Sequence, residues 1–277
     1  MKDLIKKLVE AHGPSGFEDG VRDLIRPEIE PHVDEMYVDA LGNLIGVKKG
    51  DGSGLKVMVA AHMDEIGVMV THVTKKGFLR FTNIGGVHPR TLLGARVQFS
   101  NGTVGVVHSD RLEGQVKLHP IDKHFIDVGA AGREACPVRV GDPASFMRPF
   151  LVQGSRLTAK SMDDRIGCAT AIEALKRLSG SPNDVYFVFS VQEEVGVRGA
   201  QVAANGLNPD VGIALDHYTL GASHAGSSRV SSGHCGDPAP RYTTLLVFEL
   251  LFAARVTTYV PPATNIPVPS RPSRAAE

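Results

Sequence analysis

The stretch DVYFVFSVQEEVG, residues 184–196, places two adjacent glutamates directly after an unbroken apolar run. Such a run is typical of a strand that is buried on both faces, as in a parallel sheet. A pair of neighbouring glutamates usually marks a solvated face, so the position of Glu193 and Glu194 after a buried strand is unusual. The stretch therefore predicts an α/β sheet that carries a charged site at one edge.

Two other apolar runs end in polar side chains of the same kind. His62 and Asp64 follow the run LKVMVAA at 55–61, and Asp216 closes the run VGIALD at 211–216. In open α/β sheets, ligands bind beyond the carboxyl ends of the parallel strands. If the three strands are parallel neighbours, we expect their polar ends to converge on one crevice.

The segments between these strands predict the helices of the same α/β unit. Apolar residues fall on one face of a helix at 163–178, and Asp163 and Asp164 open that helix at the positive end of its dipole. Asp163 can then reach the predicted crevice. Further helices are expected at 4–10, 18–30 and around 197–205, and two strands are expected on either side of the turn LGN at 41–43.

Residues 70–150 have a different sequence pattern, in which short stretches of alternating apolar and polar residues are separated by Gly, Asn and Pro. Weak helical periodicity and frequent turn residues predict a small all-β unit here, either a barrel or a sandwich. We therefore expect a discontinuous α/β domain formed by 1–69 and 151–277, with an inserted β domain formed by 70–150.

One histidine and several carboxylates form a ligand set that suits zinc, cobalt or manganese. A carboxylate shared between two divalent ions would support two-metal hydrolysis. Adjacent residues of an extended chain point in opposite directions, so Glu193 and Glu194 need not have the same role. One of them can bind an ion while the other acts as a general base, and Asp64 can orient His62.

Each of these features also has an ordinary structural explanation. A single histidine at a strand end is more often structural than a ligand, and the pair Asp163–Asp164 can simply cap a helix. The convergence of three strand ends that all carry ligand-type residues favours a metal site over three separate coincidences.

The composition narrows the class of protein. Lys and Arg together number 30, as do Asp and Glu, which argues against a dedicated nucleic-acid binder. The three cysteines are far apart and form no CxxC motif, which fits a reducing compartment. The longest apolar run, at 244–256, contains Glu249 and is shorter than a membrane span, so we expect a cytoplasmic protein without a membrane partner.

Six motifs stand out along the sequence: GPSGFED at 13–19, AAHMDEIGVMV at 60–70, GVHPRTLLGARV at 86–97, GAAGREA at 129–135, AKSMDDRIGC at 159–168 and SVQEEVGVRGA at 190–200. They appear in the order in which the M42 family of metallo-aminopeptidases has them, and from residue 1 to about 216 the sequence resembles that family. Some relatives carry the name endoglucanase or cellulase.

The resemblance implies an exopeptidase that holds two divalent ions, zinc or cobalt, and removes N-terminal residues from peptides. It implies a catalytic α/β domain with a mixed sheet flanked by helices, as in zinc peptidases. The inserted domain would be a β-barrel used for dimerisation. The chain would then assemble into a homo-oligomer, from a dimer to a dodecamer.

The same motifs imply a role for each residue of the site. His62 and Asp216 would bind one ion, Glu194 would bind the other, and Asp163 would bridge the two. Glu193 would be the general base, and the aspartate of the HxD pair would orient the histidine ligand.

The resemblance ends after Asp216. Family members usually continue with segments like GDTPG and GTDA and with a histidine in an HSP-like motif, which is the remaining ligand of the second ion. This chain instead has HYTLGASHAGSS at 217–228 and an end rich in Pro, Ser and Arg. Two hypotheses follow, a frameshift soon after Asp216 and a flexible tail over about the last 20 residues.

Other functions stay open at this point. A truncated, non-catalytic family member would keep the β insert, and could join assemblies without turning over substrate. A glycoside hydrolase would need two carboxylates about 5–9.5 Å apart, but would leave His62, Asp64 and Asp216 without a role. The stretches GPSG and GSSRVSSG do not match the G-x-S-x-G motif, which argues against a serine hydrolase.

Overall fold

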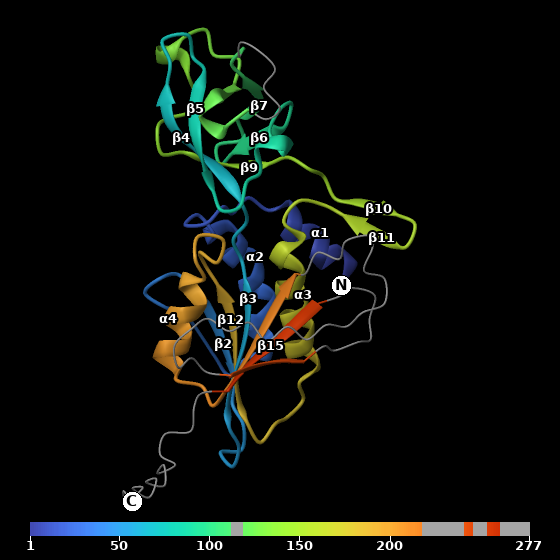
Figure 1. The fold of residues 1–277 in the computed structure, drawn as a ribbon. Coiled ribbons are helices and arrows are strands. Elements are labelled where there is room, and N and C mark those ends of the chain that lie inside the picture. Colours follow the sequence, from blue (N-terminus) through green and yellow to red (C-terminus); the bar gives the residue numbers. More distant parts are fainter. Residues whose placement is uncertain (112–118, 218–240, 246–253, 261–277) are drawn as a thin grey trace, which may run out of the picture.

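The computed structural model describes residues 1–111, 119–217, 241–245 and 254–260. Within these residues the chain forms a seven-stranded mixed sheet, a closed six-stranded barrel and a two-stranded hairpin (Figure 1). The predicted mixed α/β fold with a separate β-barrel is therefore confirmed. No helix in this part of the chain is long and apolar enough to cross a membrane.

The large sheet places the three polar strand ends side by side. Its strands, in spatial order, are β1 (Glu35–Val38), β2 (Leu44–Lys48), β12 (Asp184–Ser190), β3 (Lys56–His62), β13 (Val211–His217), β15 (Ala254–Val260) and β14 (Arg241–Leu245). The central strand β3 runs parallel to both β12 and β13. Because Ser190 is paired with His62, the segments after β12 and β3 leave the sheet at the same edge.

Helices cover both faces of this sheet, which explains its unbroken apolar runs. On one face α1 (Lys2–Glu10), α2 (Asp19–Ile29) and α3 (Met162–Arg177) share a core with β3 residues Val57, Val59 and Ala61. On the other face α4 (Arg198–Leu207) packs against Met58 and Ala60. The alternation follows from the two-residue period of a strand. Among the described residues, short 3₁₀ turns lie at Glu30–His32, Pro89–Thr91, Ile121–Lys123 and Arg133–Ala135.

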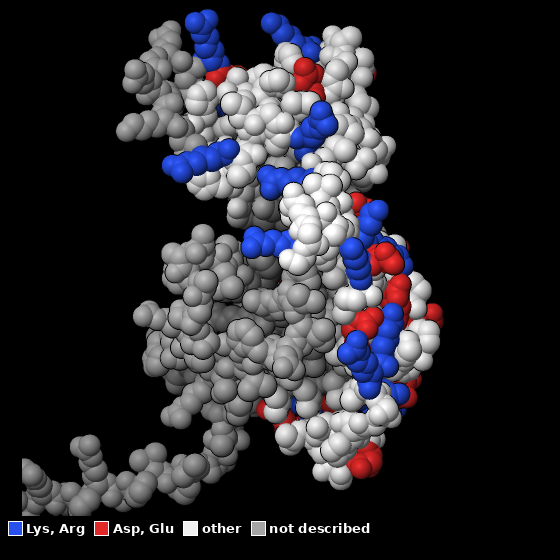
Figure 2. All heavy atoms as spheres, turned by 90° about the vertical axis from the view of Figure 1, so that its right-hand side faces the viewer, with Lys and Arg blue, Asp and Glu red and all other residues white. Residues whose placement is uncertain are grey.

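The inserted β unit is a barrel and not a sandwich. Its strands, in chain order, are β4 (Gly67–Val73), β5 (Leu79–Ile84), β6 (Arg96–Phe99), β7 (Val104–Ser109), β8 (His124–Asp127) and β9 (Pro143–Phe146). They close in the order β4-β5-β8-β7-β6-β9 around an apolar core of their own. A constriction separates the barrel from the larger part of the molecule (Figure 2). The hairpin of β10 (Leu151–Gln153) and β11 (Arg156–Thr158) projects beside this junction (Figure 1).

Two strands lie where the sequence shows no periodicity. Both β15 and β14 extend the sheet beyond β13. The strand β15 pairs antiparallel with β13, and β14 pairs antiparallel with β15. The sequence predicts no element at 241–245 or 254–260, so these two strands add to the predicted sheet. The rest of the departure from the family pattern, at 218–240, 246–253 and 261–277, lies outside the described residues. The domain limits and the dimerisation role of the barrel stay predictions.

Candidate metal site

His62 ends the central strand β3, and its side chain is only 4% exposed. Its Nδ1 lies 3.2 Å from the backbone carbonyl oxygen of Asp64 and 3.3 Å from Asp64 Oδ1. A hydrogen bond at Nδ1 fixes the tautomer and leaves Nε2 as the atom that can bind a metal. Asp64 thus occupies the position expected of a residue that orients the histidine.

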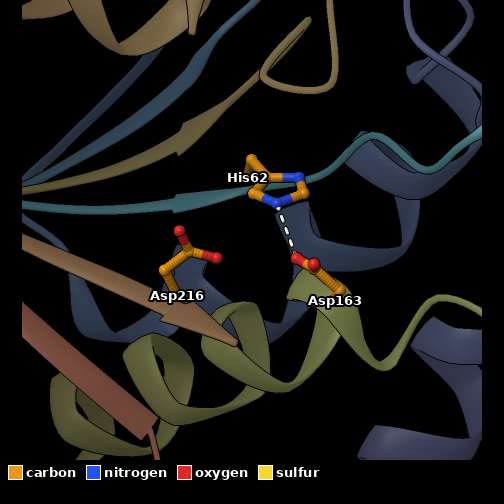
Figure 3. Close-up of side chains that lie close together, drawn as sticks. All are labelled: His62, Asp163 and Asp216. Atoms are coloured by element: carbon orange, nitrogen blue, oxygen red, sulfur yellow. Dashed lines mark hydrogen bonds and ion pairs between the residues drawn. The ribbon is translucent and has the colours of Figure 1, made fainter. Parts of the chain in front are cut away.

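Asp163 approaches the free side of this ring. Its Oδ1 lies 3.0 Å from His62 Nε2, as the dashed line in Figure 3 marks. Burial alone would lower the pKa of His62, but the hydrogen bonds with Asp163 and Asp64 outweigh burial and hold that pKa well above its usual value. In the ion-free chain a proton therefore occupies the Nε2 position for which a metal ion would compete.

The neighbouring residue, Asp164, performs the structural role that the sequence allowed for the pair. The peptide bond between Asp163 and Asp164 is cis, and both residues have non-helical backbone angles at the start of α3. Asp164 is fully buried and accepts hydrogen bonds from the backbone N–H groups of Gly167 and His62. Its bond to Gly167, three residues ahead, is an N-cap contact. Burial raises the pKa of Asp164 well above its usual value.

Asp216 completes a group of three ligands from distant parts of the chain. His62, Asp163 and Asp216 each offer one ligand atom, and these three atoms lie within 4.8 Å of one another. The three side chains come from β3, the start of α3 and β13 and face one space (Figure 3). Tetrahedral ligands at about 2.0–2.1 Å from a zinc ion are about 3.3 Å apart, so a small adjustment would place an ion between them.

Glu193 and Glu194 follow β12 at the edge of this group. Glu193 Oε2 lies 3.9 Å from His62 Nε2. Burial raises the pKa of Glu194 to about 7, an effect that His62 opposes and the carboxylates of Asp163, Asp64 and Glu193 reinforce. Burial also raises the pKa of Glu193.

The donor set fits a divalent metal ion. Among the described residues, no lysine or arginine forms an ion pair with Asp163, Glu193 or Glu194. A half-buried group of carboxylates beside one imidazole needs a positive charge from elsewhere, and oxygen and nitrogen donors of this kind suit zinc or cobalt. Of the six residues that the sequence singled out, the structure groups His62, Asp163 and Asp216, and it places Asp64 and Glu193 beside His62. Glu194 follows Glu193 on the same loop, and its backbone N–H donates to Asp64. Asp164 was missed as a contact of the site because a helix cap gives the same sequence signal.

Sequence comparisons point to one family. The family model of the M42 glutamyl aminopeptidases matches residues 42–237. A putative aminopeptidase of Acetivibrio thermocellus is 49% identical over 218 residues, which cover 78% of this chain and 66% of the relative. The lysyl aminopeptidase of Pyrococcus furiosus is 42% identical over 228 residues, which cover 77% of this chain and 65% of the relative. The chain therefore spans about two thirds of the length of these relatives.

Solved structures agree with the sequence comparisons. An aminopeptidase from the archaeon Desulfurococcus kamchatkensis has a TM-score of 0.75 at 41% identity, covering 82% of this chain and 65% of that one. The TET1 peptidase of Pyrococcus horikoshii, which can assemble into a tetrahedron or a large octahedral shell, has a TM-score of 0.73 at 34% identity, covering 84% of this chain and 73% of that one. Since the family model spans most of the chain and these relatives share its fold, the chain belongs to the M42 aminopeptidase family.

Proposed function

We propose that this chain is a metal-dependent aminopeptidase that removes N-terminal residues from peptides in the cytoplasm. The observation that carries the proposal is the convergence of His62 Nε2 with the carboxylates of Asp163 and Asp216. The support from relatives is that two proteins, 49% identical over 218 residues and 42% identical over 228 residues, are named aminopeptidases.

We assign these residues to two divalent ions, zinc or cobalt. His62 and Asp216 would hold the first ion, Glu194 would hold the second, and Asp163 would contact both. When bound, such ions make water more acidic and polarise the carbonyl group of a peptide. We expect the first ion to bind more tightly than the second, because three of the assigned side chains would contact the first ion and two would contact the second.

Glu193 is the residue we assign to proton transfer. Its Oε2 lies beside the histidine ligand at 3.9 Å, and burial raises the pKa of this carboxyl toward the range useful for a general base. It would take a proton from the attacking water and deliver it to the leaving amino group. Asp64, fully buried, would keep the His62 ring in the tautomer that binds the ion.

We also propose a homo-oligomer that forms through the barrel. The support is the similarity to a relative whose chains assemble into a closed shell. A dimer to dodecamer would fit the inserted position of the barrel, which stands apart from the site-bearing sheet (Figure 1).

The direct test is hydrolysis of a panel of unblocked amino-acid p-nitroanilides with added cobalt or zinc, and again with a chelator. We expect metal-dependent hydrolysis, and a fall in kcat of about 10²–10⁴-fold in Glu193→Gln. The control is Glu173→Gln, which removes a partly buried carboxylate on α3 that pairs with the exposed Arg177. Folded protein that forms an oligomer by size exclusion, yet shows no metal-dependent hydrolysis, would instead identify a non-catalytic family member.

A further inference from the structure

The loop that carries Glu193 and Glu194 is held by its backbone. Four consecutive N–H groups, from residues 191 to 194, each donate a hydrogen bond to a side chain from a distant part of the sequence. Val191 N donates to Asn43 Oδ1 at 2.9 Å, Gln192 N to Glu18 Oε1 at 3.0 Å, and Glu193 N and Glu194 N to the two oxygens of Asp64 at 3.0 Å each.

The three acceptor side chains are deeply buried. Asn43 and Asp64 are 0% exposed and Glu18 is 5% exposed, and they belong to three separate segments. Asn43 is fixed in turn, because its Nδ2 donates to Asp39 Oδ2 at 2.6 Å and to the carbonyl oxygen of Gly199 at 2.9 Å. A buried acceptor that is itself fixed can define the position of the loop to within a fraction of an ångström.

The carbonyl groups of the same loop are also engaged. Val191 O accepts from Gly199 N, Gln192 O from Arg198 N, and Glu193 O from the N–H groups at 196 and 197. Gln192 has a φ of 56°, a conformation that costs free energy for a residue other than glycine. The loop therefore adopts this path because the surrounding contacts impose it.

We propose that Glu18 and Asn43 are positioning residues for the metal site, which act by holding the backbone from which Glu193 and Glu194 project. The inference rests on the proposed function, because it assigns Glu194 to an ion. Asp64 connects the histidine ligand to the loop that carries the two glutamates. It contacts His62 with one oxygen and, with both oxygens, the loop of the two glutamates.

A simpler explanation is that these side chains only satisfy buried N–H groups, as folding requires. The two explanations differ in what happens to ion binding. If the acceptors only satisfy N–H groups, their removal lowers stability and leaves the affinity for an ion unchanged. If they position the loop, their removal also lowers the affinity for the ion, because residues that contact metal ligands from outside typically contribute 10–100-fold in affinity.

Glu18 offers a matched pair of variants. Its Oε1 accepts both bonds, from Gly16 N at 2.7 Å and from Gln192 N at 3.0 Å. Glu18→Gln keeps an oxygen acceptor there and removes the negative charge, whereas Glu18→Ala removes the acceptor. Asp34→Ala is the control, because it removes a carboxylate that accepts from Lys49 N at the exposed open end of the β1–β2 pair. Asn43→Ala should act in the same direction as Glu18→Ala.

The first measurement is amide hydrogen exchange in the ion-free chain, which needs no bound metal. In Glu18→Ala we expect the amides of 192–194 to exchange at least 10-fold faster than in the unaltered protein. Glu18→Gln and Asp34→Ala should stay within about 3-fold. Equal exchange in Glu18→Ala and the unaltered protein would overturn the proposal.

The second measurement is the dissociation constant for cobalt by calorimetry, with the visible absorption of the bound ion as its signature. We expect a 10–100-fold increase for Glu18→Ala, with rescue to within about 3-fold in Glu18→Gln. Faster exchange with unchanged cobalt affinity would overturn the positioning role. If the unaltered protein binds no cobalt, the proposed function fails, while the exchange data still decide whether Glu18 holds the loop.

Discussion

His62 and Glu65 lie three residues apart in the sequence, yet they belong to two clusters whose charges are balanced in opposite ways. The Glu65 cluster consists of Glu65, Lys160, Arg165, Ser161 and Ser145. The ion-site cluster consists of His62, Asp163, Glu193, Glu194 and Asp216. The segment that follows β3 contributes to both clusters. In the Glu65 cluster lysine and arginine balance the carboxylate charge, whereas the ion-site cluster has no lysine or arginine.

The Glu65 cluster is complete within the protein. Lys160 Nζ lies 2.8 and 2.7 Å from the two carboxylate oxygens of Glu65, and Arg165 Nη2 lies 3.7 Å away. The hydroxyl groups of Ser161 and Ser145 also donate to this carboxylate. Burial alone would raise the pKa of Glu65, but Lys160 and Arg165 hold it below its usual value.

The ion-site cluster shows the opposite response to burial. The pKa of Glu194 rises to about 7 because no cation of the described residues other than His62 offsets its burial. A carboxylate that the protein satisfies stabilises the fold, whereas one that the protein leaves short of positive charge is available to bind an external ion. The comparison predicts that removing a negative charge has opposite effects in the two clusters.

The largest effect is expected for Glu65→Gln. This variant leaves Lys160 and Arg165 buried without their carboxylate, which typically costs about 3–5 kcal/mol. Urea unfolding of the ion-free protein measures the change. The matched control is Glu173→Gln, whose surface ion pair with Arg177 should contribute less than about 1 kcal/mol. A loss below about 1 kcal/mol in Glu65→Gln would show that the cluster does not support the fold.

Glu194→Gln should change stability in the other direction. Because the folded-state pKa lies above the usual 4.5, the folded chain binds more protons than the unfolded chain between about pH 4.5 and 7. The charge therefore costs stability above pH 7, and the variant should stabilise the ion-free protein at pH 8 by about 1 kcal/mol, a value reduced for solvent screening. The gain should shrink as the pH falls toward 5. Destabilisation at pH 8 would refute the comparison.

Ser145→Ala tests the link between the barrel and the sheet, with a smaller effect. Ser145 lies on β9 of the barrel, and its Oγ contacts Glu65 Oε1 at 2.9 Å and His12 Nδ1 at 2.8 Å. The loss of these buried contacts should cost about 0.5–1 kcal/mol. Thr158→Ala, which removes an exposed hydroxyl that contacts Gln153, should be neutral in the same unfolding assay. Equal stabilities of the two variants would argue against this link.

The sequence predicted the ion-site cluster better than the Glu65 cluster, for a physical reason. The residues of the ion site follow apolar strands, and β12, β3 and β13 bring those ends together by local rules of sheet geometry. Lys160 and Arg165 meet Glu65 across 95 and 100 positions of the chain, and nothing in their spacing distinguishes them from charges on a helix surface.

The strands β14 and β15 could not be predicted from the sequence, because nothing local marks where they begin and end. The strand β12 has an apolar run bounded by polar residues, so its limits at Asp184 and Ser190 could be predicted from 184–190 alone. The segments 241–245 and 254–260 have no such bounded apolar run, and β15 pairs with β13 while β14 pairs with β15. Their Val, Thr and Tyr residues favour strands, but neither segment shows the bounded apolar run that marks the limits of β12. The role of Asp164 could not be predicted either, because an Asp-Asp pair at a helix start is equally typical of a helix cap and of a contact to the site.

Binding of zinc to the purified protein, followed by calorimetry, tests the central claim most directly. The account predicts that the unaltered chain binds zinc, and that Asp163→Asn weakens the tighter site by at least about 10-fold because that side chain faces His62 Nε2 at 3.0 Å. Glu65→Gln, if folded, should retain binding, since its carboxylate is already satisfied. No binding by the unaltered chain, or equal affinity in Asp163→Asn, would contradict the claim that this cluster is built for an external cation.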